Sequence, residues 1–242
     1  MAMAASTVSV RRSYSCRWGY LYYGKGLMSA KSDSIPRATI QRLSVYLQEL
    51  ESFERDDIRV VSSEQLAKAC HLNATQIRKD LTYFGEFGVR GVGYDVKGLI
   101  GSISQALSID RPWKAVLIGV GNLGKALLRH QEFRQRRFLI VGAFDVSAGI
   151  IGTVVGDITV LPYDSLKNAV GRLGVEIGII TTPVTHAQRV AEDLAQAGVK
   201  GILSFAPTRL ILPDNVFVEY VDFFNHLYSL AFHISEYEQK RS

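Results

Sequence analysis

Residues 115–124 read Ala115-Val116-Leu117-Ile118-Gly119-Val120-Gly121-Asn122-Leu123-Gly124. The apolar residues at the start predict a buried strand, and the glycines that follow have the spacing Gly-x-Gly-x-x-Gly where a helix begins. A strand, a glycine turn and a helix in this order are typical of a dinucleotide-binding domain, in which the helix N-terminus receives the diphosphate. We therefore predict that the turn binds a cofactor through Gly119, Val120, Gly121, Asn122, Leu123 and Gly124.

A carboxylate at the end of the next predicted strand indicates which dinucleotide would bind. Asp145 lies 21 residues after Gly124, where it would accept hydrogen bonds from the adenosine ribose and repel a 2′-phosphate. The sequence thus favours NADH and NAD⁺ as cofactors over their phosphorylated forms. The plainer alternative is an aspartate that only shapes the turn.

Three further candidate cofactor residues follow later strands. They are Thr182, Pro183 and Phe205, and they lie at the carboxyl ends of strands, where open α/β sheets bind ligands. Position is the only argument for them, and ordinary structural turns are the alternative.

The chain around these residues alternates short apolar runs with helical patterns, which predicts a Rossmann-like, doubly wound parallel sheet over residues 113–220. Strands are expected at 115–119, 139–144, 158–161, 177–181 and 202–205, and helices at 122–132, 163–171 and 184–197. A last helix over 221–237 is too apolar to stay solvated, so we expect it to pack on a second subunit or another domain. One stripe of this helix holds Phe224, Leu227, Tyr228, Ala231 and Phe232.

Upstream, the sequence predicts a helix-turn-helix. A helix over 36–53 is followed by a second helix whose capping box pairs Ser62 with Gln65, and by a third that Asn73 caps and that ends at Gly85. Glycines among the apolar residues of 87–94 then favour a short hairpin wing. The fold class expected is therefore α/β, with an N-terminal winged helix ahead of the Rossmann-like domain.

The third helix has the composition of a DNA-recognition helix. Ile77, Leu81 and Phe84 would face inward, which leaves an outer face that consists of Gln76, Arg78, Lys79, Thr82 and Tyr83. Glutamine and arginine suit base edges, while lysine, threonine and tyrosine usually contact phosphates. Arg90, between glycines of the wing, would reach a minor groove. An ordinary basic helix with a solvated outer face is the alternative.

Composition agrees with a polyanionic partner. The 242 residues carry a net charge of +5, and residues 1–97 hold 14 Lys and Arg against 10 Asp and Glu, as expected for a domain that neutralises phosphates. No apolar run approaches the roughly 18 residues of a membrane span. Cys16 and Cys70 lack the spacing of metal ligands. We expect a protein of the reducing cytoplasm with neither a membrane span nor a metal site.

Taken together, these motifs resemble the Rex family of redox-sensing transcriptional repressors, from about Ile35 to Tyr237. The matching segments are Ser62–Leu66, Gln76–Leu81, Tyr83–Gly88, Arg90–Tyr94, Gly119–Gly124, Phe144-Asp145, Gly201–Leu203 and Val221-Asp222. The resemblance implies a homodimer with a C-terminal helix swapped between subunits, which represses respiratory or fermentative genes and leaves its operator when NADH rises. It also adds Ser63 and Tyr94 to the DNA-binding candidates.

The resemblance further places Asp222 and Phe223 near the nicotinamide, where the family senses the oxidation state of the ring. Two positions of the network that links this site to the DNA-binding domain differ from the family pattern. His130 stands where a tyrosine is common, and Gln48 where an arginine often occurs. We expect the sensing network of this chain to differ at these positions.

The expected organisation is a disordered or extension tail over 1–33, which a start at Met28 would shorten, a winged helix over 34–97, a linker helix over 98–112, the nucleotide-binding domain, and a dimerisation helix over 221–242. A regulator is the favoured function. One alternative is a small NAD-dependent dehydrogenase with an accessory N-terminal domain, which needs an acid or base at the nicotinamide; His186 is its only candidate. Another is a nucleotide- or coenzyme A-binding module without a DNA role.

Overall fold

The computed structural model describes residues 35–85 and 92–241. The expected tail and most of the expected wing, including Arg90, lie outside the described residues. The chain divides into two compact units, Met1–Ile103 and Ser104–Ser242, and the division falls inside one helix, α4 (Val96–Ala106).

The first unit contains the predicted helix-turn-helix. Its elements are α1 (Arg37–Arg55), β1 (Val60–Val61), α2 (Ser63–Ala69), α3 (Ala74–Leu81), β2 (Tyr94–Asp95) and the greater part of α4. The Ser62–Gln65 capping box is present, and the Asn73 side chain accepts a hydrogen bond from the Gln76 N–H at 2.7 Å. Both caps confirm the predicted starts of α2 and α3. His71 makes the corner between the two helices with φ +53°.

The prediction that the third helix continues to Gly85 is wrong, because α3 ends at Leu81. After that residue the chain tightens into turns, in which the N–H of Tyr83 bonds to Asp80 O and the N–H of Phe84 to Leu81 O. Such i→i−3 bonds are common at helix ends, where they satisfy carbonyls that have lost their helical partners.

A small sheet that the sequence did not reveal closes this unit. Val60 and Val61 pair in antiparallel register with Asp95 and Tyr94, so the end of the expected wing joins the strand that precedes α2. Gly93 permits this pairing, because it has φ +112° and a Cβ there would lie 2.7 Å from Val61 O.

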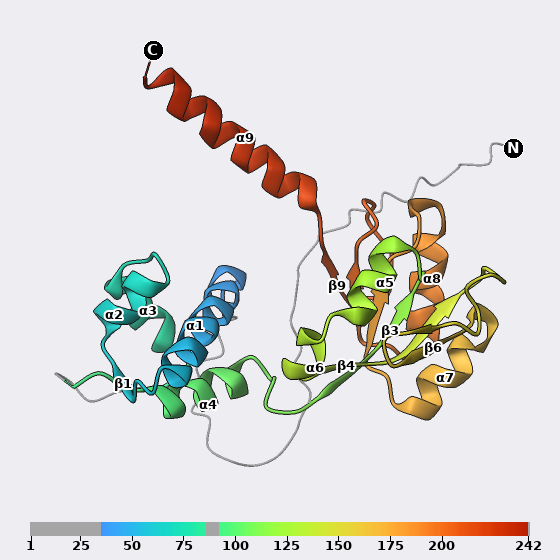
Figure 1. Cartoon of the computed structure of the whole chain (residues 1–242), viewed down its shortest axis with the longest axis horizontal. Coiled ribbons are helices and arrows are strands. Elements are labelled where there is room, and N and C mark those ends of the chain that lie inside the picture. Colours follow the sequence, from blue (N-terminus) through green and yellow to red (C-terminus); the bar gives the residue numbers. More distant parts are fainter. Residues whose placement is uncertain (1–34, 86–91, 242) are drawn as a thin grey trace, which may run out of the picture. The chain divides into compact units, whose positions relative to one another are not determined.

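The second unit is the predicted α/β domain (Figure 1). Its strands are β3 (Trp113–Ile118), β4 (Phe138–Asp145), β5 (Val154–Val155), β6 (Ile158–Pro162), β7 (Ile177–Ile180), β8 (Gly201–Ser204) and β9 (Phe217–Tyr220). Its helical elements are α5 (Asn122–Arg129), α6 (Glu132–Gln135), η1 (Tyr163–Ser165), α7 (Leu166–Leu173), α8 (Val184–Gln196) and α9 (Phe223–Gln239).

The strand order is β5-β6-β4-β3-β7-β8-β9. All neighbouring strands are parallel except β5, which is antiparallel to β6. Without β5, this is the 3-2-1-4-5-6 order of dinucleotide-binding folds, in which the direction of winding reverses between the first and fourth strands. Here these strands are β3 and β7, so the turn after β3 lies at the switch point.

Both faces of the sheet are buried, and β3 shows why. Val116 and Ile118 belong to the core cluster that α7 and α8 cover, while Ala115 and Leu117 belong to the cluster that includes Leu128 of α5. A strand covered on both faces has no polar side, which explains the continuous apolar run in the sequence.

The expected helix over 122–132 is interrupted, which corrects that prediction. His130 has an extended backbone, with ψ 104°, and separates α5 from α6. The short strands β5 and β9 were not predicted. Within the described residues, no helix is both long and apolar enough to span a membrane.

Candidate cofactor and DNA-binding sites

The glycine turn between β3 and α5 has the geometry of a phosphate-binding turn. Gly119 has φ +94°, and a Cβ there would lie 2.9 Å from the backbone nitrogen of Thr182. A Cβ on Gly124 would collide with the carbonyl oxygen of Gly119. These two glycines are therefore required by the fold itself.

Gly121 is different, because an added Cβ would meet no protein atom within 4 Å. It is the N-cap of α5, and no side chain caps the helix there. The first N–H groups of α5 are thus left for an external acceptor, with open space in front of the turn. This is what a bound diphosphate requires.

Asp145 lies at the end of β4 and holds the turn in shape. Its Oδ2 accepts a hydrogen bond from the Val120 N–H at 2.7 Å, and its Oδ1 accepts one from the Ser147 N–H at 2.8 Å. The side chain therefore has the turn-forming role that the sequence left as an alternative. Each carboxylate oxygen can accept a further hydrogen bond, so the ribose contact is compatible with this arrangement and stays a prediction.

The segment after β7 lies against the same turn. The Thr181 hydroxyl donates to Gly119 O at 2.6 Å. The Thr182 Oγ1 is buried and, alone among the buried side-chain polar atoms of the described residues, has no hydrogen-bond partner. An unpaired buried hydroxyl typically costs about 1–3 kcal/mol. A ligand that bonded to it would remove that cost, which fits the predicted role of Thr182. Pro183 is the exposed N-cap of α8.

Two aromatic candidates meet near the end of β8. The rings of Phe205 and Phe223 have centroids 6.3 Å apart. Asp222 is the N-cap of α9, and its Oδ1 accepts a hydrogen bond from the Phe224 N–H at 2.9 Å. The contact places Phe205 and the start of α9 together, as a nicotinamide site made from both would require.

Within the second unit, His130 makes its ring contact elsewhere. The His130 ring packs edge-on against Phe133, with centroids 6.1 Å apart, and in the described chain no hydrogen bond or ion pair joins it to Asp222. Gln48 is exposed on α1. His186, the acid–base candidate of the dehydrogenase alternative, is exposed on α8, as expected of an ordinary surface histidine.

In the first unit, α3 presents most of the predicted DNA-binding face. Ile77 and Leu81 are buried, while the side chains exposed on the outer face are Arg78, Lys79, Thr82 and Tyr83. Ser63 and Tyr94 are buried, and Gln76 is only partly exposed. The sequence pattern therefore located the face but did not distinguish its exposed members from those behind them.

Arg78 is held by two residues of α2. Its Nη1 donates to Ser63 Oγ at 2.5 Å and to Glu64 Oε1 at 2.9 Å. The hydrogen bond from Arg78 holds the pKa of Glu64 below its ordinary value. The side chains of Arg78 and Glu64 are 51% and 69% accessible, and ion pairs between exposed side chains are weak in water. DNA could therefore replace Glu64 as the partner of Arg78 at little cost.

The sequence analysis missed Asp80, a carboxylate behind the DNA-binding face. It is 1% exposed and accepts hydrogen bonds from Arg42, Tyr46 and Gln76. Burial alone would raise the pKa of Asp80, but these hydrogen bonds outweigh it and lower the pKa below the ordinary value. One signal was available: Asp80 lies beside Leu81 and three residues after Ile77, on the inward face of the helix, where an unpaired charge is not tolerated.

Comparison with known proteins gives a family match in each of the two units. Residues 34–82 match a family model described as "Putative DNA-binding protein N-terminus", and residues 110–208 match one described as "CoA binding domain". A curated relative from Solidesulfovibrio magneticus, named redox-sensing transcriptional repressor Rex, is 57% identical over 205 residues, which are 85% of this chain and 93% of the relative.

Two solved structures of a Rex-family repressor named RSP are also similar. The complex of RSP with NADH has a TM-score of 0.79 and 30% identity, over 87% of this chain and 99% of the other. The complex with NAD⁺ and operator DNA has a TM-score of 0.79 and 32% identity, over 90% and 97%. Because these similarities extend over most of its length, the chain belongs to the Rex family of redox-sensing transcriptional repressors.

Proposed function

We propose that this protein represses transcription by binding operator DNA through α3 and the residues that follow it, and that NADH bound at the glycine turn releases it. The observation that carries the proposal is the pairing, on one chain, of an exposed basic recognition helix with a dinucleotide turn that has open space in front of Gly121. The named relatives are repressors, which favours this function over the dehydrogenase alternative. A cytoplasmic location forms part of the proposal.

The proposed DNA contacts are made by the exposed residues of α3, with Arg78 on a base edge and Lys79, Thr82 and Tyr83 on phosphates. Arg90 would contact the DNA from outside the described residues. Ser63 acts through Arg78, whose guanidinium it binds, and Tyr94 acts from β2, where it pairs with Val61. The cofactor would lie on Gly119–Gly124, with Asp145 at the ribose and Thr182, Pro183 and Phe205 along its length.

Redox sensing requires a group that distinguishes the two forms of the nicotinamide. NAD⁺ carries a positive charge on this ring and NADH does not, so a carboxylate nearby favours NAD⁺ by electrostatic attraction. Asp222, at the start of α9 and next to the ring pair Phe205–Phe223, is the residue proposed for this role. A ligand shifts a conformational equilibrium only through such a difference in affinity.

The central experiment is a titration of operator DNA with the protein in saturating NADH and in saturating NAD⁺. Allosteric couplings commonly change affinity by about 5- to 150-fold, and we expect NADH to weaken operator binding within that range or beyond it. Coenzyme A in place of NADH is the control, and it should leave the affinity unchanged. Equal affinity in the two nicotinamide forms would disprove redox sensing.

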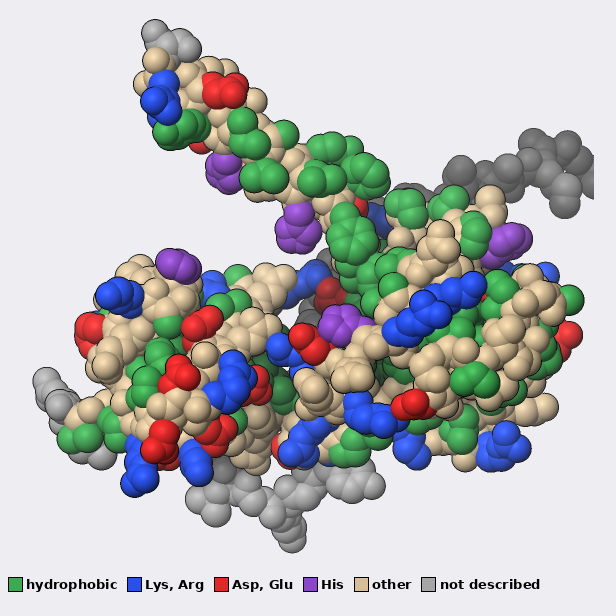
Figure 2. Space-filling view, viewed as in Figure 1, with side chains coloured by type: hydrophobic (Ala, Val, Ile, Leu, Met, Phe, Trp, Pro, Cys, Tyr) green, Lys and Arg blue, Asp and Glu red, His purple; other side chains and the backbone are tan. Residues whose placement is uncertain are grey.

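A homodimer built on α9 is also part of the proposal. Every residue of this helix is exposed in the single chain, and Figure 2 shows hydrophobic side chains along it. Besides the stripe that includes Phe224 and Tyr228, a second one runs at intervals of four and three residues through Phe223, Leu227, Leu230, Ile234 and Tyr237. Apolar surface of this extent is normally covered, and stripes on more than one side suit insertion into a second subunit, as in a swapped dimer.

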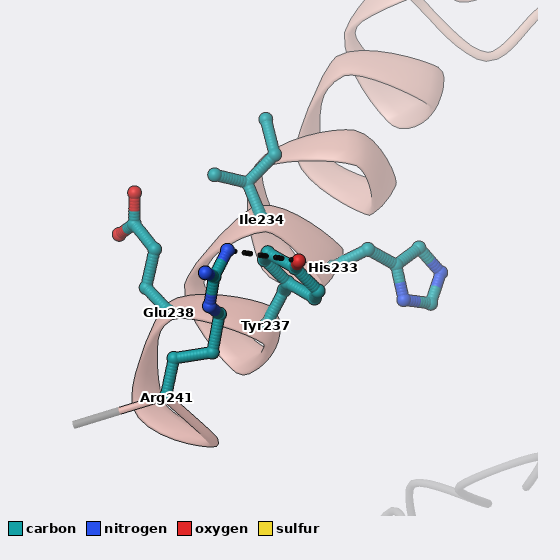
Figure 3. Close-up of a pocket in the computed structure, with 5 residues that line it drawn as sticks. All are labelled: His233, Ile234, Tyr237, Glu238 and Arg241. Carbon is teal, nitrogen blue, oxygen red and sulfur yellow. Dashed lines mark hydrogen bonds between the residues drawn. The ribbon is translucent and has the colours of Figure 1, made fainter.

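The far end of α9 is more polar (Figure 3). Arg241 donates from Nη1 to the Tyr237 hydroxyl at 3.0 Å, beside a shallow hollow lined by His233, Ile234, Tyr237, Glu238 and Arg241. All five residues belong to the last turns of the chain, so this hollow is a helix surface and not a cofactor site.

Replacing Leu227 by aspartate is expected to weaken the dimer by about 100-fold or more. Leu227 belongs to both apolar stripes. In the proposed dimer the change would remove a leucine buried at the interface, worth about 1.5–3 kcal/mol, and would bury a charge there, once in each subunit. Sedimentation equilibrium measures the effect. The matched control is Ser229→Asp, which adds the same charge on the polar side of α9. Equal dissociation of the two variants would contradict the proposed interface.

A further inference from the structure

A buried carboxylate joins the recognition helix to α1. Asp80 of α3 receives the Nε and Nη2 of Arg42 at 2.6 and 2.8 Å and the Tyr46 hydroxyl at 2.7 Å. The Thr39 hydroxyl approaches the same carboxylate at 3.3 Å. The three donor residues lie on successive turns of α1. The Asp80 side chain therefore binds α1 at three points along its length.

This arrangement fixes the orientation of α3. The Arg42 guanidinium is planar and donates two parallel hydrogen bonds, which define direction as well as distance. Asp80 is 1% exposed, and removing one partner from a buried ion pair leaves an uncompensated charge. A rotation of α3 that separated Asp80 from Arg42 is therefore strongly disfavoured.

Gln76 belongs to the same network. Its Nε2 donates to Asp80 Oδ1 at 2.8 Å, one helical turn away, and its side chain lies partly behind the exposed face. Bidentate recognition of adenine by glutamine needs both the amide N–H and the amide oxygen. One N–H of this amide is bound to Asp80, which fixes the plane of the amide group, and a turn of the side chain toward DNA would take one donor from a buried carboxylate.

We propose that Gln76 and Asp80 are positioning residues for operator recognition: they hold α3 at a fixed angle on α1, and Gln76 does not read a base. This reassigns Gln76, which the sequence pattern placed among the base-reading residues. The inference rests on the proposed function, because it concerns how the same helix meets the same operator.

The first test is Gln76→Met, which keeps the length of the side chain and removes its hydrogen bonds. Binding to the operator and to a set of operators with one base pair changed is measured by fluorescence anisotropy in NAD⁺. We expect affinity for the operator to fall about 5-fold, the effect of one lost hydrogen bond. The loss of affinity that each base-pair change causes should stay within about twofold of its value for the unmodified protein. Loss of discrimination at one base pair alone would show that Gln76 reads it and would overturn the inference.

The second test is a double-mutant cycle with Asp80→Asn. If Gln76 acts through Asp80, the two losses are not additive, and Gln76→Met should change affinity less than about twofold in the Asp80→Asn background. Additive losses would overturn the inference. Thr75→Ala, a change at an exposed site on the same helix, is the control and should have little effect.

Two measurements keep the outcomes separate. Circular dichroism shows whether Asp80→Asn folds; if it does not, the base-pair profile of Gln76→Met decides alone. The unmodified protein shows whether the proposed function holds. If the unmodified protein prefers its operator over unrelated DNA, and Gln76→Met loses discrimination at one base pair only, the positioning role fails and the repressor function stands. If it shows no preference, the repressor function itself fails, and the positioning role fails with it.

Discussion

Replacing Gly121 by valine is expected to give a repressor that stays on its operator at NADH concentrations that release the unmodified protein. The backbone there has φ −71° and ψ −161°, a conformation open to any residue, and an added Cβ meets no protein atom within 4 Å. Valine should therefore fold normally, while its methyl groups occupy the space in which the diphosphate would lie. We expect NADH affinity to fall by more than about 100-fold, or about 2.7 kcal/mol.

Calorimetric titration with NADH and operator binding with and without NADH measure the two effects. The control is Gly171→Val, the same change at an exposed glycine of α7 that also has no neighbour within 4 Å; it should respond to NADH like the unmodified protein. Normal NADH binding by Gly121→Val would mean that the cofactor does not lie over this turn. Gly124 could not serve in this test, because a side chain there presses on the carbonyl of Gly119 and would disturb the fold.

Replacing Arg78 by leucine is expected to weaken operator binding by about 10- to 100-fold, the usual range for a lost arginine–base contact. Arg78 is the exposed arginine of α3, and its partner Glu64 is also exposed, so the side chain can exchange that partner for DNA. Binding to the operator and to unrelated DNA of the same length, at several salt concentrations, measures the change.

The neighbouring Lys79→Ala is the matched control. A lysine on a phosphate contributes equally to all sequences, so this variant should bind both duplexes more weakly by one factor and lower the salt slope by about one. Arg78→Leu should instead lose preference for the operator. Arg78→Lys should not restore it, because lysine lacks the planar fork of donors. An equal loss on both duplexes for Arg78→Leu would assign Arg78 to a phosphate.

The sequence predicted those parts of the fold that depend on near neighbours in the chain. The Ser62–Gln65 and Asn73–Gln76 caps span three residues each, and the switch-point turn follows from glycines within six residues. It did not predict that Val60-Val61 would pair with Tyr94-Asp95, because strands of two residues carry no periodic signal and their pairing depends on distant segments.

The same distinction applies to the candidate sites. Polar residues at neighbouring positions of α3 look alike in the sequence, and only the structure shows that the Gln76 side chain is bound to Asp80. Thr182 was selected by its place at a strand end, and the structure adds that its hydroxyl is buried without a partner. The proposed partner of α9 is a second subunit, which the sequence of one chain does not position.

The two hydrogen bonds that Asp145 accepts from the backbone N–H groups of Val120 and Ser147 have a consequence for how quickly the protein responds. Both partners belong to the protein itself, so the turn keeps its shape without a contact from the cofactor, and we expect cofactor exchange to need no slow remodelling of the main chain. We expect the delay between a change in cellular NADH and the change in gene expression to be set by the rate at which the bound cofactor dissociates.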